Sequence, residues 1–599
     1  MKINEIEFIK KTVFELFNFH YEGTISIEDF DGVRVVGDAQ GVSIGCNTKC
    51  SFARGLFLLA KDLSEGKDRI EIEQKAHFST CGVMLSLSGG CVLKADSVKK
   101  FISYMAACGM NSLLMYMEDI YELENYPYFG YMRGRYSEKE LRDIDDFADK
   151  LGVEIIPCIQ TLGHLKTYLH WAEAGKVRDS AEVMLVGEEK TYEFISDMIK
   201  LFSRSFRSRR IHIGMDEAFT MGHGKYAQLH KKVNRKEMFI EHLERVKTLC
   251  REEGLRPLIW SDMIFRLCVD GIIEDEYDPK SVITEDIKQA VSDVDIVYWD
   301  YYRTEQSAYD SIIKRHQEIT PNTFFAGGIW TWDSYLPNFQ YTIDTTFPAM
   351  RACLSNGVSD VWGTMWDFGD INFFHAIPCL AAFSEFSWRG DNCCEEDVLT
   401  TAEFLSGVSR EVIYASSEFF LGRDGMVRLG KRFFEADPFY ELIRYDVDYS
   451  EAIKQYDKAV EVLYRHNGND FAEYSALCLE IARQKCRLFL WLRSAYNQRD
   501  NTRLKQIADE YIPELESLYN KFIAVWEKNV RMTCKPFGME LLQIRLAGIK
   551  ERLRYARETL CRYYNGEIKC IEELEHPLLS GDNRISLEAD AHMKTIYTK

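Results

Sequence analysis

Two adjacent carboxylic acids, Asp216 and Glu217, are the most chemically suggestive residues of the sequence. They end the run RIHIGMDE, whose first part is apolar and strand-like. Adjacent acids are common on solvated surfaces, but the apolar run before this pair favours a buried strand end instead. Two neighbouring carboxyl groups in different environments can serve as a general acid and as an ionised partner. The pair is therefore the first candidate for a catalytic site.

Aromatic side chains gather in the part of the chain that follows. Six of the ten Trp lie between residues 260 and 366, and five of them stand at or near the ends of apolar runs: Trp260, Trp299, Trp330, Trp332 and Trp366. The C–H face of a sugar ring stacks on an indole, and its hydroxyl groups donate to carboxylates. Aromatic rings beside acids therefore favour a neutral, polyhydroxylated ligand over a charged one.

Eight apolar segments alternate with helical patterns from about residue 79 onwards. They cover residues 81–88, 111–118, 153–161, 210–217, 256–263, 295–302, 322–330 and 359–367. Nearly continuous apolar strands are typical of a parallel sheet that is covered on both faces. Eight such strands in about 300 residues predict an α/β fold, a (β/α)8 TIM barrel, whose active site lies at the carboxyl ends of the strands. The rival, a doubly wound open sheet, usually has a Gly-rich turn after its first strand, and Ser88–Gly90 is not such a turn.

Two further units flank the predicted barrel. Short strand-like runs and one helical run predict a small α/β domain over residues 1–76, with the barrel over 77–392. Beyond residue 392 the strand pattern fades into long amphipathic helices. Residues 393–599 are therefore predicted to form an α-helical C-terminal domain, with structural support, subunit contact or a wall over the site as open alternatives for its role.

Composition excludes several classes of partner. The 599 residues carry 94 acidic and 74 basic side chains and a formal charge of −20. Such a balance argues against nucleic acid or an anionic membrane as a general partner. The 13 His show no cluster at strand ends, so neither a metal nor another cofactor is expected. A homodimer is possible, because homodimers are common among soluble proteins.

The cysteines and the N-terminal residues bear on the compartment. The 17 Cys are odd in number and scattered, mostly in apolar surroundings, which is typical of free thiols in a reducing setting. No run approaches the length needed to cross a bilayer. Charged residues interrupt the apolar character of the first residues, so no signal peptide is expected. The expected location is the cytoplasm.

The reaction class follows from which acids stand at which strand ends. A retaining glycosidase with a protein nucleophile would be expected to place a Glu after the fourth and the seventh strands. The seventh segment continues as GGIWTWD and contains no Glu. An adjacent Asp–Glu pair better fits substrate-assisted catalysis, in which the 2-acetamido oxygen of the sugar attacks C1.

On these residues the chain resembles the β-N-acetylhexosaminidases of glycoside hydrolase family 20, of the bacterial intracellular type. The matching motif is Gly214-Met215-Asp216-Glu217, and the similarity covers the small α/β unit and the barrel to about residue 390. The resemblance implies that Asp216 orients the acetamido group and that Glu217 is the acid/base. It also implies a hydrogen-bonded chain from Asp119 through His164 to Glu217 that tunes the acid.

The same resemblance implies a sugar pocket, with one clear departure from the family. Family pocket positions match Trp260, Trp299, Trp366 and Asp333, and further binding residues are expected at Glu118, Tyr301, Trp332 and Asp367. The family Arg that grips O3 and O4 after the first strand is replaced in the stretch 81–89. Recognition of O3 and O4 must therefore differ, and Glu118 is a candidate for part of it.

The predicted function is a retaining exo-β-N-acetylhexosaminidase that releases terminal GlcNAc or GalNAc from small oligosaccharides through an oxazolinium intermediate. A disaccharide-releasing (lacto-N-biosidase-like) or phosphosugar-specific relative remains an alternative, with Arg133, Arg135 and Arg303 as the obvious phosphate candidates. A barrel that binds sugars without cleaving them is a further alternative, although the presence of both Asp216 and Glu217 argues against it.

Overall fold

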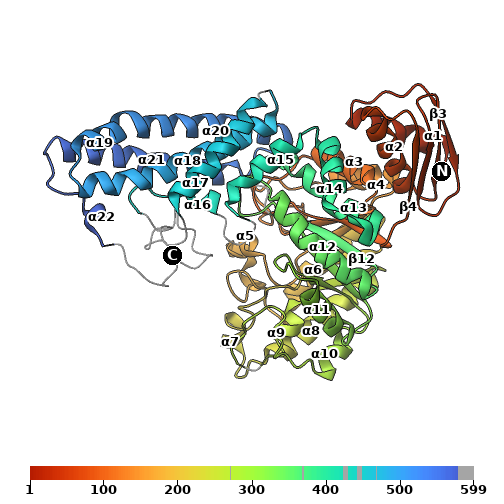
Figure 1. The fold of residues 1–599 in the computed structure, drawn as a ribbon. Coiled ribbons are helices and arrows are strands. Elements are labelled where there is room, and N and C mark those ends of the chain that lie inside the picture. The colour runs from red at the N-terminus through yellow and green to blue at the C-terminus, as the bar shows by residue number, and fades with distance from the viewer. Residues whose placement is uncertain (270, 367–369, 423–428, 441–447, 467, 578–599) are drawn as a thin grey trace.

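The computed structural model describes the whole chain apart from residues 270, 367–369, 423–428, 441–447, 467 and 578–599. A central barrel carries the N-terminal unit on one side and a helical bundle on the other, at the right and left of Figure 1. Within the described residues, no helix is long and apolar enough to cross a bilayer.

The N-terminal unit is a four-stranded sheet with a helix packed on it. The strands are β1 (Thr24–Glu28), β2 (Val33–Gly37), β3 (Gly41–Cys46) and β4 (Ile70–Gln74), in the order β1-β3-β2-β4. Helix α2 (Lys49–Ser64) buries Phe52, Leu56 and Leu59, and Thr48 caps its first turn by accepting from the Ser51 backbone N–H. Helix α1 (Ile3–Leu16) precedes the sheet.

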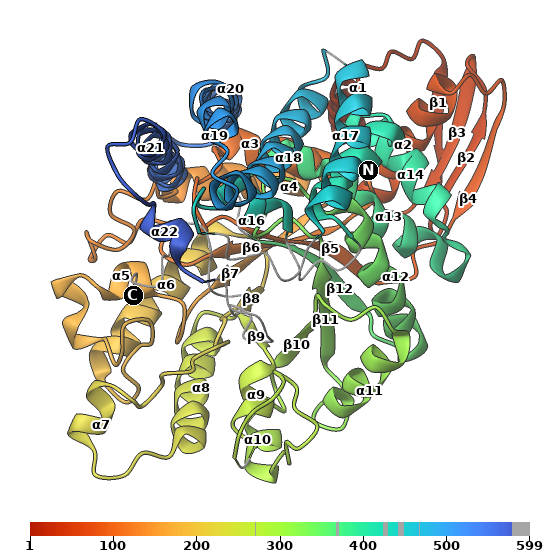
Figure 2. The same cartoon turned by 60° about the vertical axis from the view of Figure 1, so that its left-hand side comes forward.

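Eight parallel strands close into the predicted barrel, which confirms the fold class (Figure 2). They are β5 (Thr80–Ser86), β6 (Ser112–Met117), β7 (Glu154–Ile159), β8 (Arg210–His212), β9 (Arg256–Trp260), β10 (Asp295–Trp299), β11 (Thr323–Gly328) and β12 (Asp360–Met365). The barrel interior is filled by side chains that include Met84, Leu114, Ile156, Leu258 and Trp362. The interior is therefore a packed core, and space for a ligand exists only at its ends.

Helices cover the outside of the barrel. They include α3 (Ala95–Ala107), α4 (Glu138–Leu151), α6 (Glu189–Ser205), α8 (Arg235–Glu252), α10 (Glu285–Ala290), α11 (Gln306–Gln317), α12 (Phe339–Ser355) and α13 (Leu380–Arg389). Helix α4 illustrates the local causes: Ser137 and Glu140 form a capping box at its start, and Gly152, at φ 78°, ends it.

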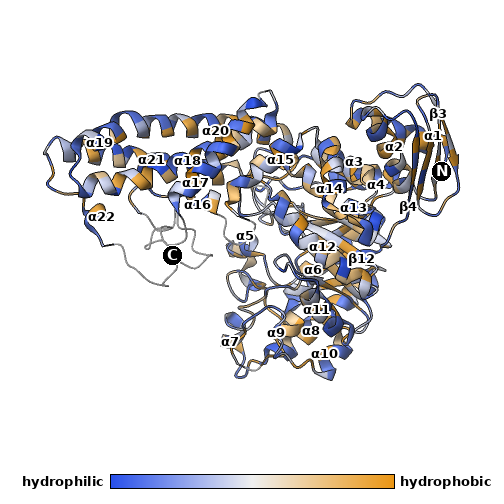
Figure 3. Cartoon of the chain, in the orientation of Figure 1, coloured by the Kyte–Doolittle hydropathy of each residue, from blue (hydrophilic) through white to orange (hydrophobic). Residues whose placement is uncertain are grey.

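The C-terminal bundle consists of long amphipathic helices. They include α14 (Glu395–Ser406), α15 (Arg410–Ser417), α16 (Leu429–Glu435), α17 (Tyr449–Arg465), α18 (Asp470–Asn497), α20 (Ile512–Thr533) and α21 (Met539–Tyr564). Hydrophobic and hydrophilic segments alternate along them in Figure 3, as expected for helices that bury one face. The domain boundaries predicted from the sequence, at residues 76/77 and 392/393, remain predictions.

Asp370, in the loop after β12, connects the C-terminal bundle to the end of the barrel at which the strands have their carboxyl ends. Lys431 Nζ of α16 lies 3.1 Å from its carboxylate, and Arg545 Nη1 of α21 lies 2.7 Å from it. Tyr474 of α18 donates to the Asp370 backbone carbonyl at 3.0 Å. Three helices of the bundle therefore converge on one loop of the barrel.

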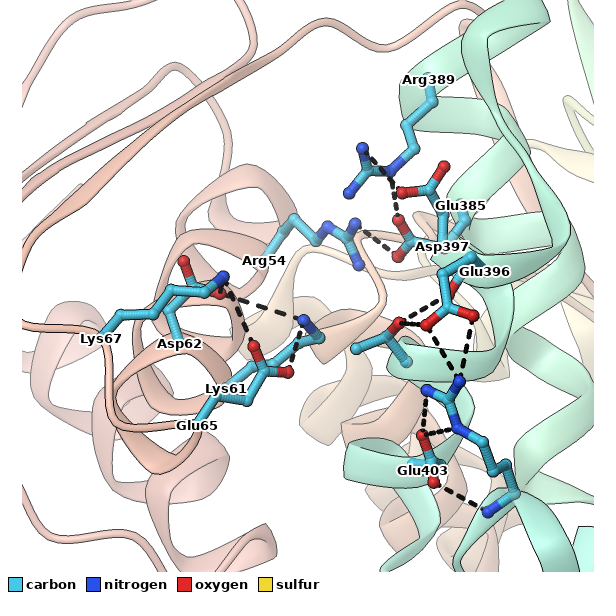
Figure 4. Close-up of polar contacts among 12 residues, drawn as sticks. Arg54, Lys61, Asp62, Glu65, Lys67, Glu385, Arg389, Glu396, Asp397 and Glu403 are labelled. Carbon is cyan, nitrogen blue, oxygen red and sulfur yellow. Dashed lines mark hydrogen bonds and ion pairs between the residues drawn. The ribbon is translucent and has the colours of Figure 1, made fainter.

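A buried ion pair joins the N-terminal unit to the barrel. Arg54 of α2 and Glu385 of α13 are 2.6 Å apart, with side chains 0% and 1% exposed (Figure 4). Arg54 also donates to Gln74, and Arg389 holds the second Glu385 oxygen at 2.8 Å. The pair is thus fully desolvated and surrounded by further hydrogen bonds.

We expect Arg54→Met to lower the free energy of unfolding by about 3 kcal/mol, because it leaves the Glu385 carboxylate buried with one cation fewer. Chemical denaturation measures the loss. Arg204→Met, which removes an exposed partner of Glu138, is the matched control and should cost under about 1 kcal/mol. The double variant Arg54→Met/Glu385→Leu should be more stable than the single one. Equal losses for Arg54 and Arg204 would contradict this account.

Candidate active site

A left-handed turn after β8 presents the two predicted catalytic acids. Gly214, Met215 and Glu217 have φ values of 71°, 74° and 45°. A Cβ on Gly214 would lie 2.8 Å from the Ile159 carbonyl oxygen, and the φ of 71° is one that side chains rarely adopt, so glycine is favoured there. Left-handed backbone costs a non-glycine residue roughly 1–3 kcal/mol and occurs most often at functional sites. Here it places two adjacent acids after a short strand so that both reach Nε2 of His164.

Asp216 is held as a carboxylate. Its Oδ2 lies 3.1 Å from His164 Nε2, and its Oδ1 accepts a hydrogen bond from Gln160 Nε2 at 2.9 Å. Burial alone would raise the pKa of Asp216, but the His164 charge and the hydrogen bonds from His164 and Gln160 lower it below its usual value. The group is therefore a fixed negative charge at the bottom of the site.

Glu217 has the opposite tendency. Burial and the neighbouring Asp216 charge raise the pKa of Glu217 to about 7, although the His164 charge opposes the shift. Its Oε2 lies 3.4 Å from His164 Nε2, and its side chain is 36% exposed. The Glu217 backbone N–H donates to Asp262 Oδ2 at 2.9 Å, which fixes the turn. Near neutral pH this carboxyl group can both give and take a proton.

Both acids approach Nε2 of His164, which lies on the loop after β7. Burial would lower its pKa, but the charge and hydrogen bond of Asp216 and the charges of Glu217 and Glu118 raise the pKa of His164 to about 10. The imidazole is therefore positively charged across the physiological range. Its charge balances the Asp216 and Glu217 carboxyl groups beside Nε2.

These residues line a cavity of about 270 Å³ at the carboxyl ends of the strands. Nine predicted site residues lie in its wall: Glu118, His164, Asp216, Glu217, Trp260, Trp299, Tyr301, Trp332 and Trp366. Its volume is at the small end of ligand sites, which suits a single sugar ring.

Aromatic rings form most of one wall. Trp299 and Tyr301 are stacked with centroids 5.3 Å apart, and Trp332 meets Tyr301 edge-on at 5.4 Å. Trp330 stacks behind Trp332 at 4.2 Å and fixes its plane. Trp366 packs against the same cluster and meets Tyr116 edge to face at 4.8 Å. Because the rings pack against one another, this wall of the cavity is preformed in the absence of a ligand.

Two predicted site residues have other surroundings than expected, and a third lies outside the described residues. Asp119 is 1% exposed and lies 3.2 Å from the Arg133 guanidinium. The ion-pair contacts of His164 are with Asp216 and Glu217. The expected Asp119–His164–Glu217 chain is therefore corrected: Asp119 pairs with Arg133, and Asp216 takes its place beside His164. Asp333 lies outside the cavity wall, 3.8 Å from Lys431 Nζ. Asp367 lies outside the described residues.

Several wall residues were missed from the sequence: Ser86, Ser88, Tyr116 and Tyr302. Strand periodicity would have found three of them. Met84 points into the barrel, so Ser86 and Ser88 follow on the same face, and Leu114, Tyr116 and Glu118 are related in the same way. Tyr116 donates to Glu118 at 3.2 Å and accepts from Gln160 at 3.1 Å.

Glu118 extends the polar side of the cavity. Burial raises the pKa of Glu118 to about 7, with the His164 charge opposing the shift. Beside it stand the Ser86 and Ser88 hydroxyl groups, where the family Arg was expected. The Ser86 and Ser88 hydroxyl groups and the Glu118 carboxyl group thus stand where the family has an Arg guanidinium. In the described part of the chain, no group of three or more His, Cys, Asp or Glu is arranged to hold a metal ion.

Comparison with known proteins gives matches over most of the chain. A model of the glycosyl hydrolase family 20 catalytic domain matches residues 81–390, and a model of the glycoside hydrolase 20C C-terminal domain matches residues 435–593. Hexosaminidase D of Bos taurus is 26% identical over 189 residues, 29% of this chain and 53% of that protein. The human hexosaminidase D is 26% identical over 205 residues, 31% of this chain and 40% of that protein. The chain thus spans about half the length or less of these relatives.

Among solved structures, the Streptomyces plicatus N-acetyl-β-hexosaminidase is 17% identical with a TM-score of 0.48, over 68% of this chain and 90% of that one. The β-N-acetylhexosaminidase of Bacteroides fragilis is also 17% identical, with a TM-score of 0.47, over 63% and 81%. The catalytic-domain model spans more than half of the 599 residues. The chain therefore belongs to glycosyl hydrolase family 20.

Proposed function

We propose that the protein is a retaining exo-β-N-acetylhexosaminidase that removes terminal N-acetylhexosamine from oligosaccharides in the cytoplasm. The observation that carries the proposal is the arrangement around His164. An ionised Asp216 lies 3.1 Å from Nε2 of the imidazolium, and Glu217, whose pKa is about 7, lies 3.4 Å from the same nitrogen. One carboxylate and one carboxylic acid suit a reaction that needs a fixed charge and a mobile proton.

In this mechanism the sugar supplies its own nucleophile. The acetamido N–H donates to Asp216, and the acetamido carbonyl oxygen attacks C1 as the C1–O bond to the leaving group breaks. Glu217 gives its proton to the departing oxygen, and the Asp216 charge stabilises the positive oxazolinium ring. Glu217 then takes a proton from a water molecule that attacks C1 from the side the leaving group left. Two inversions at C1 give overall retention.

The size of the cavity supports removal of one sugar at a time. A volume of about 270 Å³, walled by Trp299, Trp332 and Trp366, holds a single ring and favours a chain end over an internal unit. Glu118, Ser86 and Ser88 offer hydrogen bonds to the ring hydroxyls, in place of the family Arg.

Turnover of matched nitrophenyl glycosides tests the proposal. The protein should hydrolyse 4-nitrophenyl N-acetyl-β-glucosaminide or its galacto epimer, and should leave 4-nitrophenyl β-glucoside, which has no acetamido group, essentially intact. A thiazoline mimic of the oxazolinium ring should inhibit competitively. Comparable hydrolysis of the glucoside would refute substrate assistance, and sugar binding without turnover would favour a non-catalytic barrel.

The pH dependence should report Glu217 as the acid. Because Glu217 must be protonated to assist the leaving group, kcat/KM should fall as pH rises through about 7. Asp216 has a lowered pKa and stays ionised in mild acid. His164→Gln removes a positive charge that lowers the Glu217 pKa, so its alkaline limb should move to higher pH. A limb that stays in place, or moves down, would contradict the assignment.

A further inference from the structure

An exposed cluster of apolar side chains lies on the loops that follow β6 and β7, two of the strands whose carboxyl ends carry cavity residues. Tyr128 and Tyr131, on the loop after β6, are each 44% exposed, and Met132 next to them is 62% exposed. Trp171, on the loop after β7, is half-buried against them. We call these four residues the aromatic platform. Exposed apolar side chains that gather in one patch are often part of a binding site.

The rings of the platform hold one another in place. The Tyr128 centroid lies 5.1 Å from that of Trp171, and the Tyr131 centroid lies 5.9 Å from it. The two Tyr rings are 5.9 Å apart, and His170 packs against Trp171 at 4.7 Å. Trp171 is thus the half-buried ring on which the cluster packs, while the two tyrosines present surface to solvent.

The loop after β6 is hydrogen-bonded to a residue of the cavity wall. Arg133 donates to Asp119 Oδ1 at 3.2 Å and to the Ser88 carbonyl at 2.6 Å, and Ser88 lines the cavity. A Cβ on Gly130 would lie 1.8 Å from the Asp119 carbonyl, so the chain packs closely there too. Tyr131 and Met132 therefore lie between Gly130 and Arg133, which both contact Asp119, the residue that follows Glu118.

The loop after β7 connects Trp171 to the catalytic group. Trp171 follows His164 by seven residues, and Lys166–Leu169 form the short helix α5. Helical rise and the length of extended chain limit the two Cα atoms to at most about 19 Å apart. The loop that carries His164 therefore also carries the support of the platform. Glu217, which faces the leaving group in the proposed mechanism, follows the adjacent strand β8.

We propose that the aromatic platform is a binding subsite for the reducing-end sugars of an oligosaccharide whose terminal residue occupies the cavity. The inference rests on the proposed function, because it assumes that the cavity holds a terminal sugar. Tyr rings suit this ligand: the negative ring face attracts sugar C–H groups, and the phenol hydroxyl can meet a ring hydroxyl.

Dependence of rate on chain length tests the subsite. For the unaltered protein, kcat/KM should be higher for chitotetraose than for chitobiose. Tyr128→Ala, Tyr131→Ala or Trp171→Ala should each lower the ratio of kcat/KM for chitotetraose to that for 4-nitrophenyl N-acetyl-β-glucosaminide by about threefold to tenfold. Trp171→Phe should recover part of the ratio. Tyr464→Ala, which removes a 48% exposed ring on α17, is the matched control and should leave the ratio unchanged.

Three results would overturn the subsite: no dependence on chain length, an equal effect of Tyr464→Ala, or platform variants that dissociate an oligomer with the ratio unchanged. The last would make the platform a contact between copies of the chain. Calorimetric binding of chitotetraose to Glu217→Gln protein, with and without Tyr131→Ala, measures the subsite without turnover. If the unaltered protein cleaves nothing, the proposed function fails, and weaker binding by the Tyr131→Ala protein would still support the subsite.

Discussion

Glu217→Gln should lower kcat on chito-oligosaccharides by about 10³-fold, within the range that general acid catalysis contributes. The sugar alkoxide is a poor leaving group and needs the proton that Glu217 supplies. The amide keeps the shape of the side chain but cannot donate that proton. Steady-state kinetics on chitobiose measures the loss, and KM should change little because the ground state keeps its contacts.

The leaving group provides an internal control for this variant. Nitrophenolate departs without strong protonation, so the loss on 4-nitrophenyl N-acetyl-β-glucosaminide should be smaller by about tenfold or more. Glu122→Gln, on an exposed residue of the loop after β6, should leave both rates within about twofold. Equal losses of Glu217→Gln on both substrates would mean that Glu217 is not the proton donor.

Asp216→Asn should lower kcat by about 10²- to 10³-fold, as expected when a preorganised charge facing the transition state is removed. The asparagine can still meet the acetamido group but cannot balance the positive oxazolinium ring. Steady-state kinetics on the acetamido substrate measures the loss, and thiazoline affinity should fall more than affinity for the product sugar.

The pH profile of Asp216→Asn separates this role from a structural one. The Asp216 charge raises the pKa of Glu217, so its removal should shift the alkaline limb to lower pH. That is the opposite of the shift expected for His164→Gln. Unchanged kcat, or a limb that moves upward, would show that Asp216 does not act next to the acid as proposed.

The barrel could be predicted because its strands are apolar for nearly their whole length. Segments such as 111–118 and 153–161 are buried on both faces, so burial and sequence pattern coincide. The carboxyl end of each strand then indicates where polar residues matter. By this rule Glu118, His164 and Glu217 were placed correctly at one mouth.

The contacts between loops could not be predicted in the same way. His164 reaches Asp216 because His164, Met215 and Glu217 all adopt left-handed backbone, which no residue-type pattern announces. Asp119 accepts a hydrogen bond from Arg133, which lies 14 residues further along the same loop. Asp333 faces Lys431 from the bundle, nearly 100 residues away. Such pairings depend on tertiary geometry, which local patterns do not contain.

The convergence of three bundle helices on Asp370 limits how the protein can be divided. The match to the catalytic-domain model ends at residue 390, before Lys431 and Arg545. A barrel expressed alone to that point would leave Asp370 without both cations, on the loop that directly follows Trp366. The catalytic barrel is thus not an exchangeable module, and chimeric enzymes built from this chain should join partners inside the bundle rather than at its border.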